Sequence, residues 1–236
     1  SPTDLGIMAS LASLQKSKVS PNEIDQLIAA NIGQSSYDSY FLPRHIGLFS
    51  GLPTEVPALM VQRICGSGFE TIITAAEQIT LSKANAVLCT GAENMSLSPL
   101  VSFGNRMGFT LGNPVFKDML WEALDDTAAG YPMGYTAENI AQRYSITRKD
   151  CDVFALLSFN RAIAAQNKKY FQEEIAPVNS SVFEAKGLKP RKFKLPGGAK
   201  DFANDEQVRE TSLESLEKLK PVFSDVGVLT AGNCSG

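Results

Sequence analysis

Hydrophobic and polar positions follow two different periods over the first hundred residues. Apolar residues recur at helical spacing over residues 5–14, 43–49 and 67–79, which predicts three helices with one apolar face each. Three short apolar runs, at residues 26–31, 56–61 and 86–89, predict buried strands. Helices and strands therefore alternate, which indicates an α/β fold with a parallel sheet covered by helices on both faces.

The pattern changes after Gly91. Residues 95–133 are rich in Met, Phe, Gly and Pro without a sustained period, so we expect an elaborated loop region. Thr147 and Asp150 form a capping-box pattern that predicts the start of a helix. Residues 186–205 are rich in Lys, Gly and Pro and are expected to be exposed, and a last short helix is expected before Pro221.

Cys65 is the residue of greatest chemical interest, because it lies between a predicted strand and the helix predicted from Ser67. Unpaired N–H groups and the positive end of the helix dipole favour a thiolate at such a place. Gly66 and Gly68 would let a ligand or another backbone approach closely. A cysteine at a strand end is more often a small buried hydrophobic residue. Spacing alone leaves a nucleophile and a core residue as alternatives.

The composition is that of an ordinary soluble globular protein. The 236 residues carry 22 basic and 25 acidic side chains, a formal net charge of -3, and 44% are hydrophobic. The chain has no basic excess, no apolar run of membrane-spanning length and no secretory signal at its start. We therefore expect no nucleic-acid or membrane partner, and a cytoplasmic location or, in a eukaryote, an organelle matrix.

The cysteines and the histidine give no indication of a metal site. Four cysteines, at positions 65, 89, 151 and 234, are widely spaced, so we expect reduced thiols rather than a disulfide framework. No two of them have the spacing of metal ligands, and the chain has one histidine, His45. His45 lies on a predicted helix, and a structural role is expected for it. We predict no bound metal.

Six segments together resemble a known family. Residues 63–68, with the sequence Arg-Ile-Cys-Gly-Ser-Gly, closely resemble the nucleophile motif of the thiolases. Five further segments, which begin at Gly91, Met133, Glu174, Leu219 and Thr230, resemble thiolase motifs in family order. The resemblance implies the N-terminal half of a thiolase. It would comprise a core half at residues 1–98, with an incomplete parallel-type mixed sheet and helices on both faces, and a mainly helical loop or lid domain at residues 99–236.

Thiolases, which include acetyl-CoA acetyltransferases and 3-ketoacyl-CoA thiolases, form or cleave β-ketoacyl-CoA through an acyl-cysteine intermediate. The resemblance implies that Cys65 carries the acyl group and that its N–H helps to stabilise the oxyanion. Coenzyme A would be a substrate rather than a permanently bound cofactor. The matching lid positions for coenzyme A are Arg209, Ser215 and Ser235, and those for the pantetheine tunnel are Met133 and Phe223. A core role for Met133 and Phe223, and a solvated helix face for Ser215, stay as alternatives.

The sequence departs from the family in two respects. Many biosynthetic thiolases have a histidine just before the Met-Gly pair of the lid motif, where this chain has Tyr131 and Pro132, and this argues against acetoacetyl specificity. The second half of the family, with its proton-transferring histidine and second cysteine, does not appear in these 236 residues. We therefore expect the residues from 1 to 236 to be incomplete for catalysis and another segment or chain to supply the rest. The resemblance also implies a homodimer or homotetramer.

Other functions fit less well or stay open. A non-catalytic acyl-CoA-binding or lipid-binding member of the superfamily and a purely structural fragment are both compatible with the sequence. A cysteine hydrolase is a weaker alternative, because Arg63 stands where its nucleophile elbow needs glycine. A phosphate-binding loop is weaker still, because Gly66 to Gly68 are not followed by the required lysine.

Overall fold

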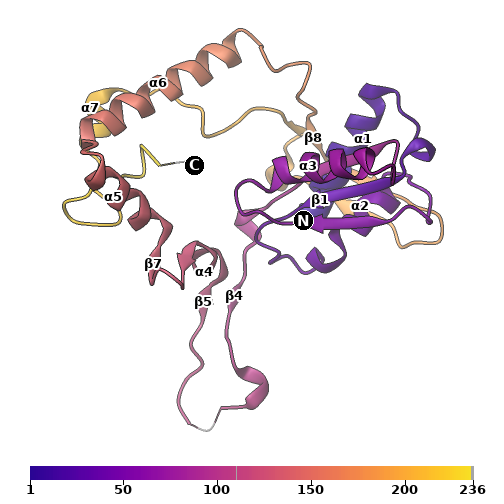
Figure 1. Ribbon diagram of the computed structural model, residues 1–236, viewed down its shortest axis with the longest axis horizontal. Coiled ribbons are helices and arrows are strands. Elements are labelled where there is room, and N and C mark those ends of the chain that lie inside the picture. The colour runs from indigo at the N-terminus through magenta and orange to yellow at the C-terminus, as the bar shows by residue number, and fades with distance from the viewer. Residues whose placement is uncertain (110, 235–236) are drawn as a thin grey trace. The chain divides into compact units, whose positions relative to one another are not determined.

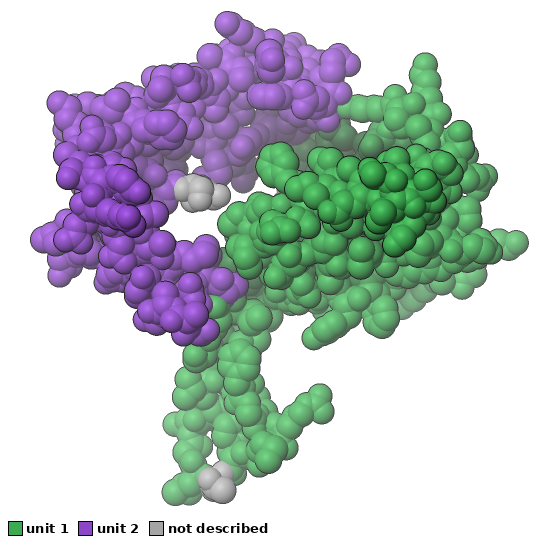
Figure 2. Space-filling view, in the orientation of Figure 1, with its two compact units in different colours: residues 1–122, 176–202 green, residues 123–175, 203–236 purple. Residues whose placement is uncertain are grey.

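The computed structural model describes residues 1–109 and 111–234. Two compact units are distinguished by their internal contacts, unit 1 (residues 1–122 and 176–202) and unit 2 (residues 123–175 and 203–236), as Figure 2 shows. This division does not follow the boundary expected between residues 98 and 99, because residues 99–122 and 176–202 belong to unit 1. The division into a core half and a lid domain stays a prediction.

Unit 1 contains the alternating helices and strands that the hydrophobic pattern predicts. Its central sheet has the order β2-β1-β3, and both pairings are parallel. Figure 1 shows the helices of this region packed around these strands. The elements are α1 (Pro2–Ser17), β1 (Gln26–Ala30), α2 (Leu42–Phe49), β2 (Ala58–Val61), α3 (Ser67–Thr80) and β3 (Val87–Gly91).

Helices cover both faces of this sheet, as expected. Successive strand residues point to opposite faces, and Leu88 and Cys89 of β3 show which helix covers each. Leu88 packs in one buried cluster with Ile7 of α1 and Ile46 of α2. The thiol of Cys89 donates a hydrogen bond of 3.4 Å to the carbonyl of Thr71 in α3. Helices α1 and α2 therefore cover one face, and α3 covers the other.

The core lies between α1, α2 and the sheet. Ile7, Leu27, Leu42 and Ile46 are completely buried there, and each such side chain contributes about 1.5–3 kcal/mol through its removal from water. Gly6 lets the two helices approach closely, because a Cβ at this position would lie within 3.0 Å of the side chain of Ile46. The absence of a side chain at position 6 thus permits the packing of α1 on α2.

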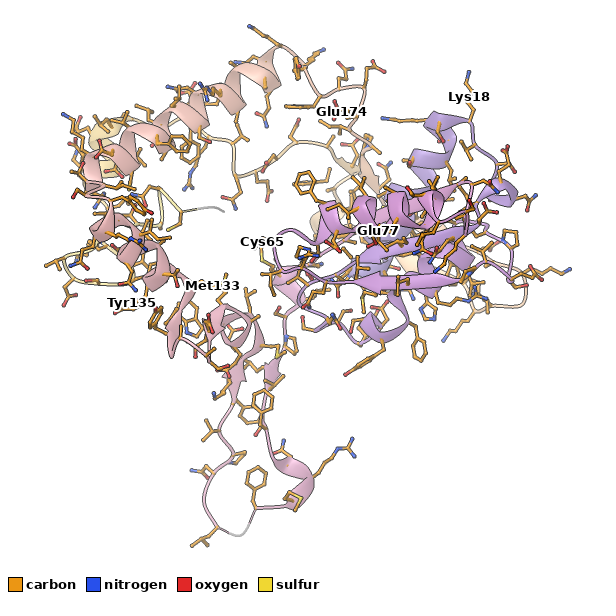
Figure 3. The ribbon with its side chains drawn as sticks, viewed as in Figure 1. Lys18, Cys65, Glu77, Met133, Tyr135 and Glu174 are labelled. Atoms are coloured by element: carbon orange, nitrogen blue, oxygen red, sulfur yellow. The ribbon has the colours of Figure 1, made fainter. Side chains whose placement is uncertain are left out.

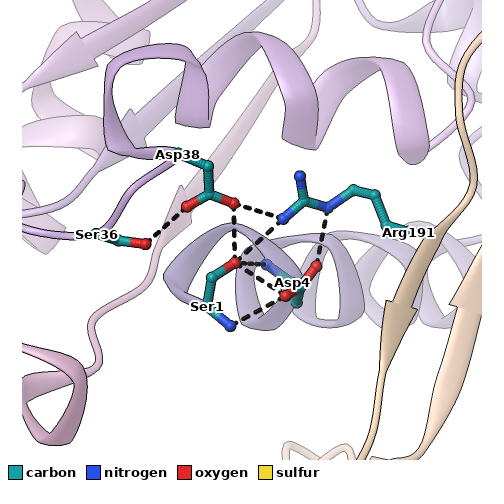
Figure 4. A network of polar contacts seen from close by, with 5 residues as sticks. All are labelled: Ser1, Asp4, Ser36, Asp38 and Arg191. Atoms are coloured by element: carbon teal, nitrogen blue, oxygen red, sulfur yellow. Dashed lines mark hydrogen bonds and ion pairs between the residues drawn. The ribbon is translucent and has the colours of Figure 1, made fainter.

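A hairpin from far along the chain completes this side of unit 1. Strands β9 (Ser181–Phe183) and β10 (Arg191–Phe193) pair in antiparallel fashion. Arg191 donates from Nε to Asp4 at 2.8 Å and pairs through Nη2 with Asp38 (Figure 4). The expectation that residues 186–205 are exposed is therefore wrong at Arg191, which is largely buried in this network.

The remainder of unit 1 consists of short elements, as expected from the lack of a sustained period. Two-residue strands form small antiparallel pairs, and single helical turns connect them. These elements are η1 (Pro21–Glu23), η2 (Ser39–Phe41), η3 (Met95–Leu97), β4 (Leu100–Val101), η4 (Asn105–Met107), β5 (Lys117–Asp118), α4 (Met119–Leu124, which crosses into unit 2), β8 (Val178–Asn179), η5 (Pro196–Gly198) and β11 (Asp201–Phe202).

Unit 2 is mainly helical. It contains β6 (Asp125–Asp126), β7 (Tyr131–Pro132), α5 (Met133–Arg143), α6 (Arg148–Asn167) and α7 (Leu213–Glu217). The predicted capping box at Thr147 is confirmed, since its side chain accepts from the N–H of Asp150 and the Asp150 carboxylate accepts from the N–H of Thr147. Among the described helices of both units, none is long and apolar enough to cross a membrane.

Candidate active site

Cys65 lies on a tight turn between β2 and α3. The N–H of Gly66 donates to the carbonyl of Arg63 at 3.0 Å, and the N–H of Ser67 donates to the carbonyl of Ile64 at 3.0 Å. Ile64 has a φ of 45°, in the left-handed region, which an isoleucine rarely adopts. The turn leaves the thiol of Cys65 exposed at the start of α3 (Figure 3). The structure therefore favours an accessible thiol over a buried core residue.

The side chain of Ser67 stabilises this turn through two hydrogen bonds to its backbone. Its hydroxyl donates to the carbonyl of Ile64 at 2.6 Å and accepts from the N–H of Arg63 at 2.8 Å. Ser67 is completely buried. Gly66 brings the backbone close, because a Cβ there would lie 3.3 Å from the carbonyl oxygen of Arg63, whereas Gly68 faces open space. A turn held by these hydrogen bonds, with the thiol of Cys65 open to solvent, is a suitable support for a nucleophile.

The N-terminus of α3 provides a positive electrostatic environment beside the thiol. The N-cap residue is Gly66, which has no side chain to bond the first N–H groups of the helix. The N–H of Ser67 already donates to the carbonyl of Ile64, whereas the next N–H groups of the first turn have no partner inside the helix and lie at the positive end of its dipole. They are suited to an anion, either a thiolate or an oxyanion formed on an acyl group.

Glu93 fixes the surroundings of this turn. The carboxyl ends of parallel strands meet at one edge of a sheet, where ligands of α/β proteins commonly bind. There the Glu93 carboxylate accepts from the N–H of Ile32 at 2.8 Å, the N–H of Gly33 at 2.9 Å and the amide of Asn31 at 2.9 Å. The carbonyl of Ile32 in turn accepts from the side chain of Gln62 at 3.0 Å. Glu93 thereby connects β1 and β3 to the loop that carries Cys65.

Glu93 lies in the family-like segment that begins at Gly91, but no sequence pattern predicted a role for it. An acidic residue directly after a parallel strand was the available signal, because such a residue lies at the edge where sites form. Its four N–H donors come from residues 31–33, about sixty positions earlier, and from the adjacent Asn94. No local pattern predicts that pairing.

Two of the predicted lid residues, Met133 and Phe223, lie in unit 2, where Phe223 contacts the neighbours of Met133 in α5. Met133 is the first residue of α5, and the ring of Phe223 lies directly against Gly134, the second. Ser215 lies in α7, where its hydroxyl is 2.9 Å from that of the N-cap residue Ser212. Arg209 is exposed. Among the described residues, neither Arg209 nor Ser215 shares a hydrogen bond or ion pair with Met133 or Phe223.

Ser235 lies outside the described residues. The ring of His45 stacks on Phe41 with centroids 5.7 Å apart, and burial, followed by the charge of Arg191, lowers the pKa of His45. In the described part of the chain, no three His, Cys, Asp or Glu side chains are grouped so that they could hold a metal ion.

The other three cysteines differ from Cys65 in their surroundings. Burial raises the pKa of Cys89, Cys151 and Cys234, and for Cys151 the carboxylates of Asp152 and Asp150 raise it further. None of them lies on a turn between a strand and a helix of the parallel sheet. Of the four cysteines, Cys65 is the one that lies on such a turn with an exposed side chain.

Comparison with known proteins agrees with this geometry. The family model described as "Thiolase, N-terminal domain" matches residues 1–236. The chain is 42% identical over 236 residues to the human 3-ketoacyl-CoA thiolase, mitochondrial, covering 99% of this chain and 56% of that protein. It is 37% identical over 240 residues to an acetyl-CoA acetyltransferase of Cupriavidus necator, with the same coverage of 99% and 56%.

Solved structures give the same result. The crystal structure of human mitochondrial 3-ketoacyl-CoA thiolase in complex with CoA superposes with a TM-score of 0.88 at 41% identity, covering 100% of this chain and 56% of that chain. The Bacillus anthracis acetyl-CoA acetyltransferase superposes with a TM-score of 0.87 at 33% identity, with the same coverage. The chain thus spans about half the length of these relatives, and it belongs to the thiolase N-terminal domain family.

Proposed function

We propose that the complete protein is a thiolase-type acyltransferase that forms or cleaves β-ketoacyl-CoA through an acyl group carried on Cys65. The observation that supports this most directly is the exposed thiol on a braced turn at the N-terminus of a helix. A metabolic role in the turnover of fatty acids or other lipids follows from this chemistry.

In the cleavage direction, the Cys65 sulfur attacks the keto carbon of a 3-ketoacyl-CoA. The bond between C2 and C3 of the substrate breaks, C2 takes up a proton, and acetyl-CoA leaves. The thiol of a second coenzyme A then attacks the acyl-cysteine, and its proton returns to the Cys65 sulfur as the shortened acyl-CoA is released. We propose that the backbone N–H of Cys65, beside the start of α3, helps to stabilise the oxyanion of each addition step.

The proton transfers need an acid and a base that we do not assign within this chain. His45 is the one histidine of the sequence. It stacks on Phe41 of η2, and its lowered pKa reflects burial and the nearby positive charge of Arg191. We propose that another segment or chain supplies the general base, and that residues 1–236 contribute the nucleophile.

We also propose that residues of unit 2 hold coenzyme A. The apolar side chains of Met133 and Phe223 are suited to the pantetheine arm, and the exposed Arg209 and Ser215 to its polar groups. Ser235 belongs to the same proposal. Coenzyme A acts here as a substrate, and no permanently bound cofactor is proposed.

Incubation of the complete protein with acetyl-CoA, followed by peptide mass spectrometry, tests the proposal. One acetyl group is expected on the peptide that contains Cys65, with release of one equivalent of coenzyme A. Binding of coenzyme A without acylation of Cys65 would favour a non-catalytic acyl-CoA-binding protein instead. A protein that binds no coenzyme A ester in calorimetry would contradict both functions and favour a structural role.

We further propose a homodimer or homotetramer that acts in the cytoplasm or, in a eukaryote, in an organelle matrix. Phe69, Ile72 and Ile73 of α3 have large exposed apolar side chains, a kind of surface that proteins commonly cover by association. Light scattering of the complete protein should give a mass of at least two chains. A monomer across the micromolar range would contradict the proposed assembly.

A further inference from the structure

The turn that carries Cys65 has an unusual backbone conformation at Ile64. Its φ of 45° lies in the left-handed region, where a β-branched residue is a clear outlier. The other described non-glycine residues with a positive φ are Lys18, Gln34, Ser82, Ser145 and Lys169. All of these except Gln34 lie at or just after the end of a helix, where this conformation is common. Ile64 precedes a helix instead, and its side chain is half exposed, so burial offsets little of the strain.

Ser67 holds Ile64 in this conformation. Its hydroxyl accepts from the N–H of Arg63 and donates to the carbonyl of Ile64, and the N–H of Ser67 donates to the same carbonyl. The carbonyl oxygen of Ile64 thus has two donors from one completely buried residue. Strained backbone conformations persist where the surrounding contacts over-determine them, and they cluster at functional sites. The bonds from Ser67 are contacts of this kind.

The direction of the Ile64 carbonyl also sets the direction of the Cys65 N–H, because both belong to one peptide group. The described residues contain no cis peptide bond, so this group is trans and planar, and its C=O and N–H point in opposite directions. Since the carbonyl is directed at the buried Ser67, the N–H of Cys65 points away from Ser67. None of the hydrogen bonds given above for the turn uses this N–H, so they orient it without occupying it.

We infer that Ser67 is a positioning residue, whose hydroxyl orients the N–H of Cys65 toward the oxyanion that forms when the Cys65 sulfur adds to a thioester. This inference rests on the proposed function, in which that N–H stabilises the oxyanion. Without the hydroxyl, Ile64 can return to a negative φ, and the peptide group between Ile64 and Cys65 turns with it. The thiol stays at the start of α3, so its attack on a saturated carbon is unaffected.

Two reagents separate these effects in the complete protein. With S-ethyl thioacetate, the Cys65 sulfur adds to the carbonyl carbon and an oxyanion forms. The C–S bond to ethanethiol then breaks, and ethanethiol takes up the proton lost by Cys65. With iodoacetamide, the sulfur displaces iodide from a saturated carbon, and no oxyanion forms. Peptide mass spectrometry measures both rates at Cys65 between about pH 6 and pH 9, where cysteine thiols commonly ionise.

The expected result is a slower acylation without a slower alkylation. Removal of an oxyanion donor costs about 10²–10³-fold in rate, and Ser67→Ala leaves the donor present but free to turn, so acylation should slow about tenfold to hundredfold. Alkylation should stay within about threefold of wild type, with the same midpoint pH, because it depends on the thiolate alone. A purely structural role for Ser67 would change both rates together. Ser67→Thr keeps the hydroxyl and should be acylated at least about tenfold faster than its isostere Ser67→Val.

Thr71→Val is the matched control, because Thr71 is also buried in α3 and its hydroxyl donates at 2.7 Å to a carbonyl outside the turn, that of Gly68. The ratio of its two rates should stay within about twofold of wild type. A Ser67→Ala ratio within about threefold of wild type, or equal acylation of Ser67→Thr and Ser67→Val, would overturn the inference and leave the proposed function intact. If neither S-ethyl thioacetate nor acetyl-CoA acylates Cys65 of the wild type, both are overturned.

Discussion

Units 1 and 2 are stabilised in different ways. The sheet of unit 1 lies against a continuous cluster of buried aliphatic side chains, among them Ile7, Leu27 and Ile46. In the described part of unit 2, the buried hydrophobic residues are Ala141, Ala155 and Leu216. Unit 1 therefore owes its stability mainly to apolar burial, and unit 2 depends far more on specific polar contacts.

Unit 2 is held together largely by hydrogen bonds to two carboxylates rather than by an extensive apolar core. Glu138 accepts from the backbone of residues 228–229. Asp152, completely buried in α6, accepts from Arg148 at 2.8 Å and from the side-chain amide of Asn233 at 2.9 Å. Regions with few buried apolar contacts open locally at lower free energy than a core does. The proposed nucleophile thus lies on a rigid unit, and the proposed coenzyme A site on a more easily opened one.

The largest effect is expected from removal of the proposed nucleophile, which should abolish acyl transfer and leave the fold intact. Cys65→Ala should lower acyl transfer by about 10⁴-fold or more, as removal of a nucleophile does in other enzymes. Because the Cys65 side chain is exposed, the thermal unfolding temperature of the Cys65→Ala protein should equal that of the wild type. Cys151→Ala, the matched control at a cysteine of α6 outside the proposed site, should retain activity. Equal losses of activity in both variants, measured by coenzyme A release, would contradict the role of Cys65.

The second prediction concerns the buried network of unit 1. Arg191→Met should lower the free energy of unfolding by about 3 kcal/mol, because it leaves the carboxylates of Asp4 and Asp38 buried without their cation. Urea unfolding of the complete protein at pH 7 measures this. Arg63→Met, which removes an exposed ion pair with Glu70, is the matched control and should not shift the unfolding midpoint. Equal midpoints for the two variants would contradict the prediction.

The same network predicts how stability depends on pH. Burial by itself would raise the pKa of Asp4 and of Asp38, but the hydrogen bonds from Arg191 and Ser1 outweigh it and hold both pKa values below the ordinary range. Below pH about 4 the unfolded chain then binds protons that the folded chain does not, so the network's contribution is complete at neutral pH and is lost as the pH falls. The stability difference between wild type and Arg191→Met should therefore shrink between pH 5 and pH 3.

The third prediction tests whether Glu93 positions the nucleophile. In Glu93→Gln, the amide group replaces one carboxylate oxygen and cannot accept from the N–H groups of Asn31, Ile32 or Gly33 that face it. Acylation of Cys65 by a short thioester without the pantetheine arm should slow about tenfold. The KM for coenzyme A should be unchanged. An unaltered acylation rate, or a changed KM with an unaltered rate, would rule out the positioning role.

The three central strands of unit 1 and the helices α1, α2 and α3 were predictable because each has a local cause. The 3.6-residue period predicted α1, α2 and α3, and the short apolar runs predicted the three strands of the sheet. The capping pair Thr147 and Asp150 predicted the start of α6. The burial of Arg191, a charged residue, could not be predicted from its neighbours in the sequence. Arg191 stands in a polar segment and is buried only because Asp4, 187 positions away, and Asp38, 153 positions away, neutralise it.

The candidate site was predictable only in part, for the same reason. Cys65 could be found from its position between a strand and a helix, together with its family-like motif. The contact of Phe223 with Gly134 joins residues that are far apart in sequence, and a glycine in a helix carries no sign of what packs on it. The bonds from Glu93 to residues 31–33 are equally non-local. The residues that support a site are thus harder to predict than the residue that performs the chemistry.

The smallest effect is expected from Glu138→Gln, and it is best compared with that of Glu93→Gln. Each carboxylate accepts from two adjacent backbone N–H groups in addition to any other donors, but Glu138 does so in unit 2. Glu138→Gln loses the bond to Val228 or to Leu229, which costs about 1.5–3 kcal/mol locally. Part of this free energy is recovered because the released N–H group of the loop can donate to water instead. The KM for coenzyme A should therefore rise only about threefold to tenfold. Acylation of Cys65 by the short thioester should keep its wild-type rate, because that reagent does not need unit 2. If Glu138→Gln instead slowed this acylation as much as Glu93→Gln does, the two units would not divide chemistry and binding between them.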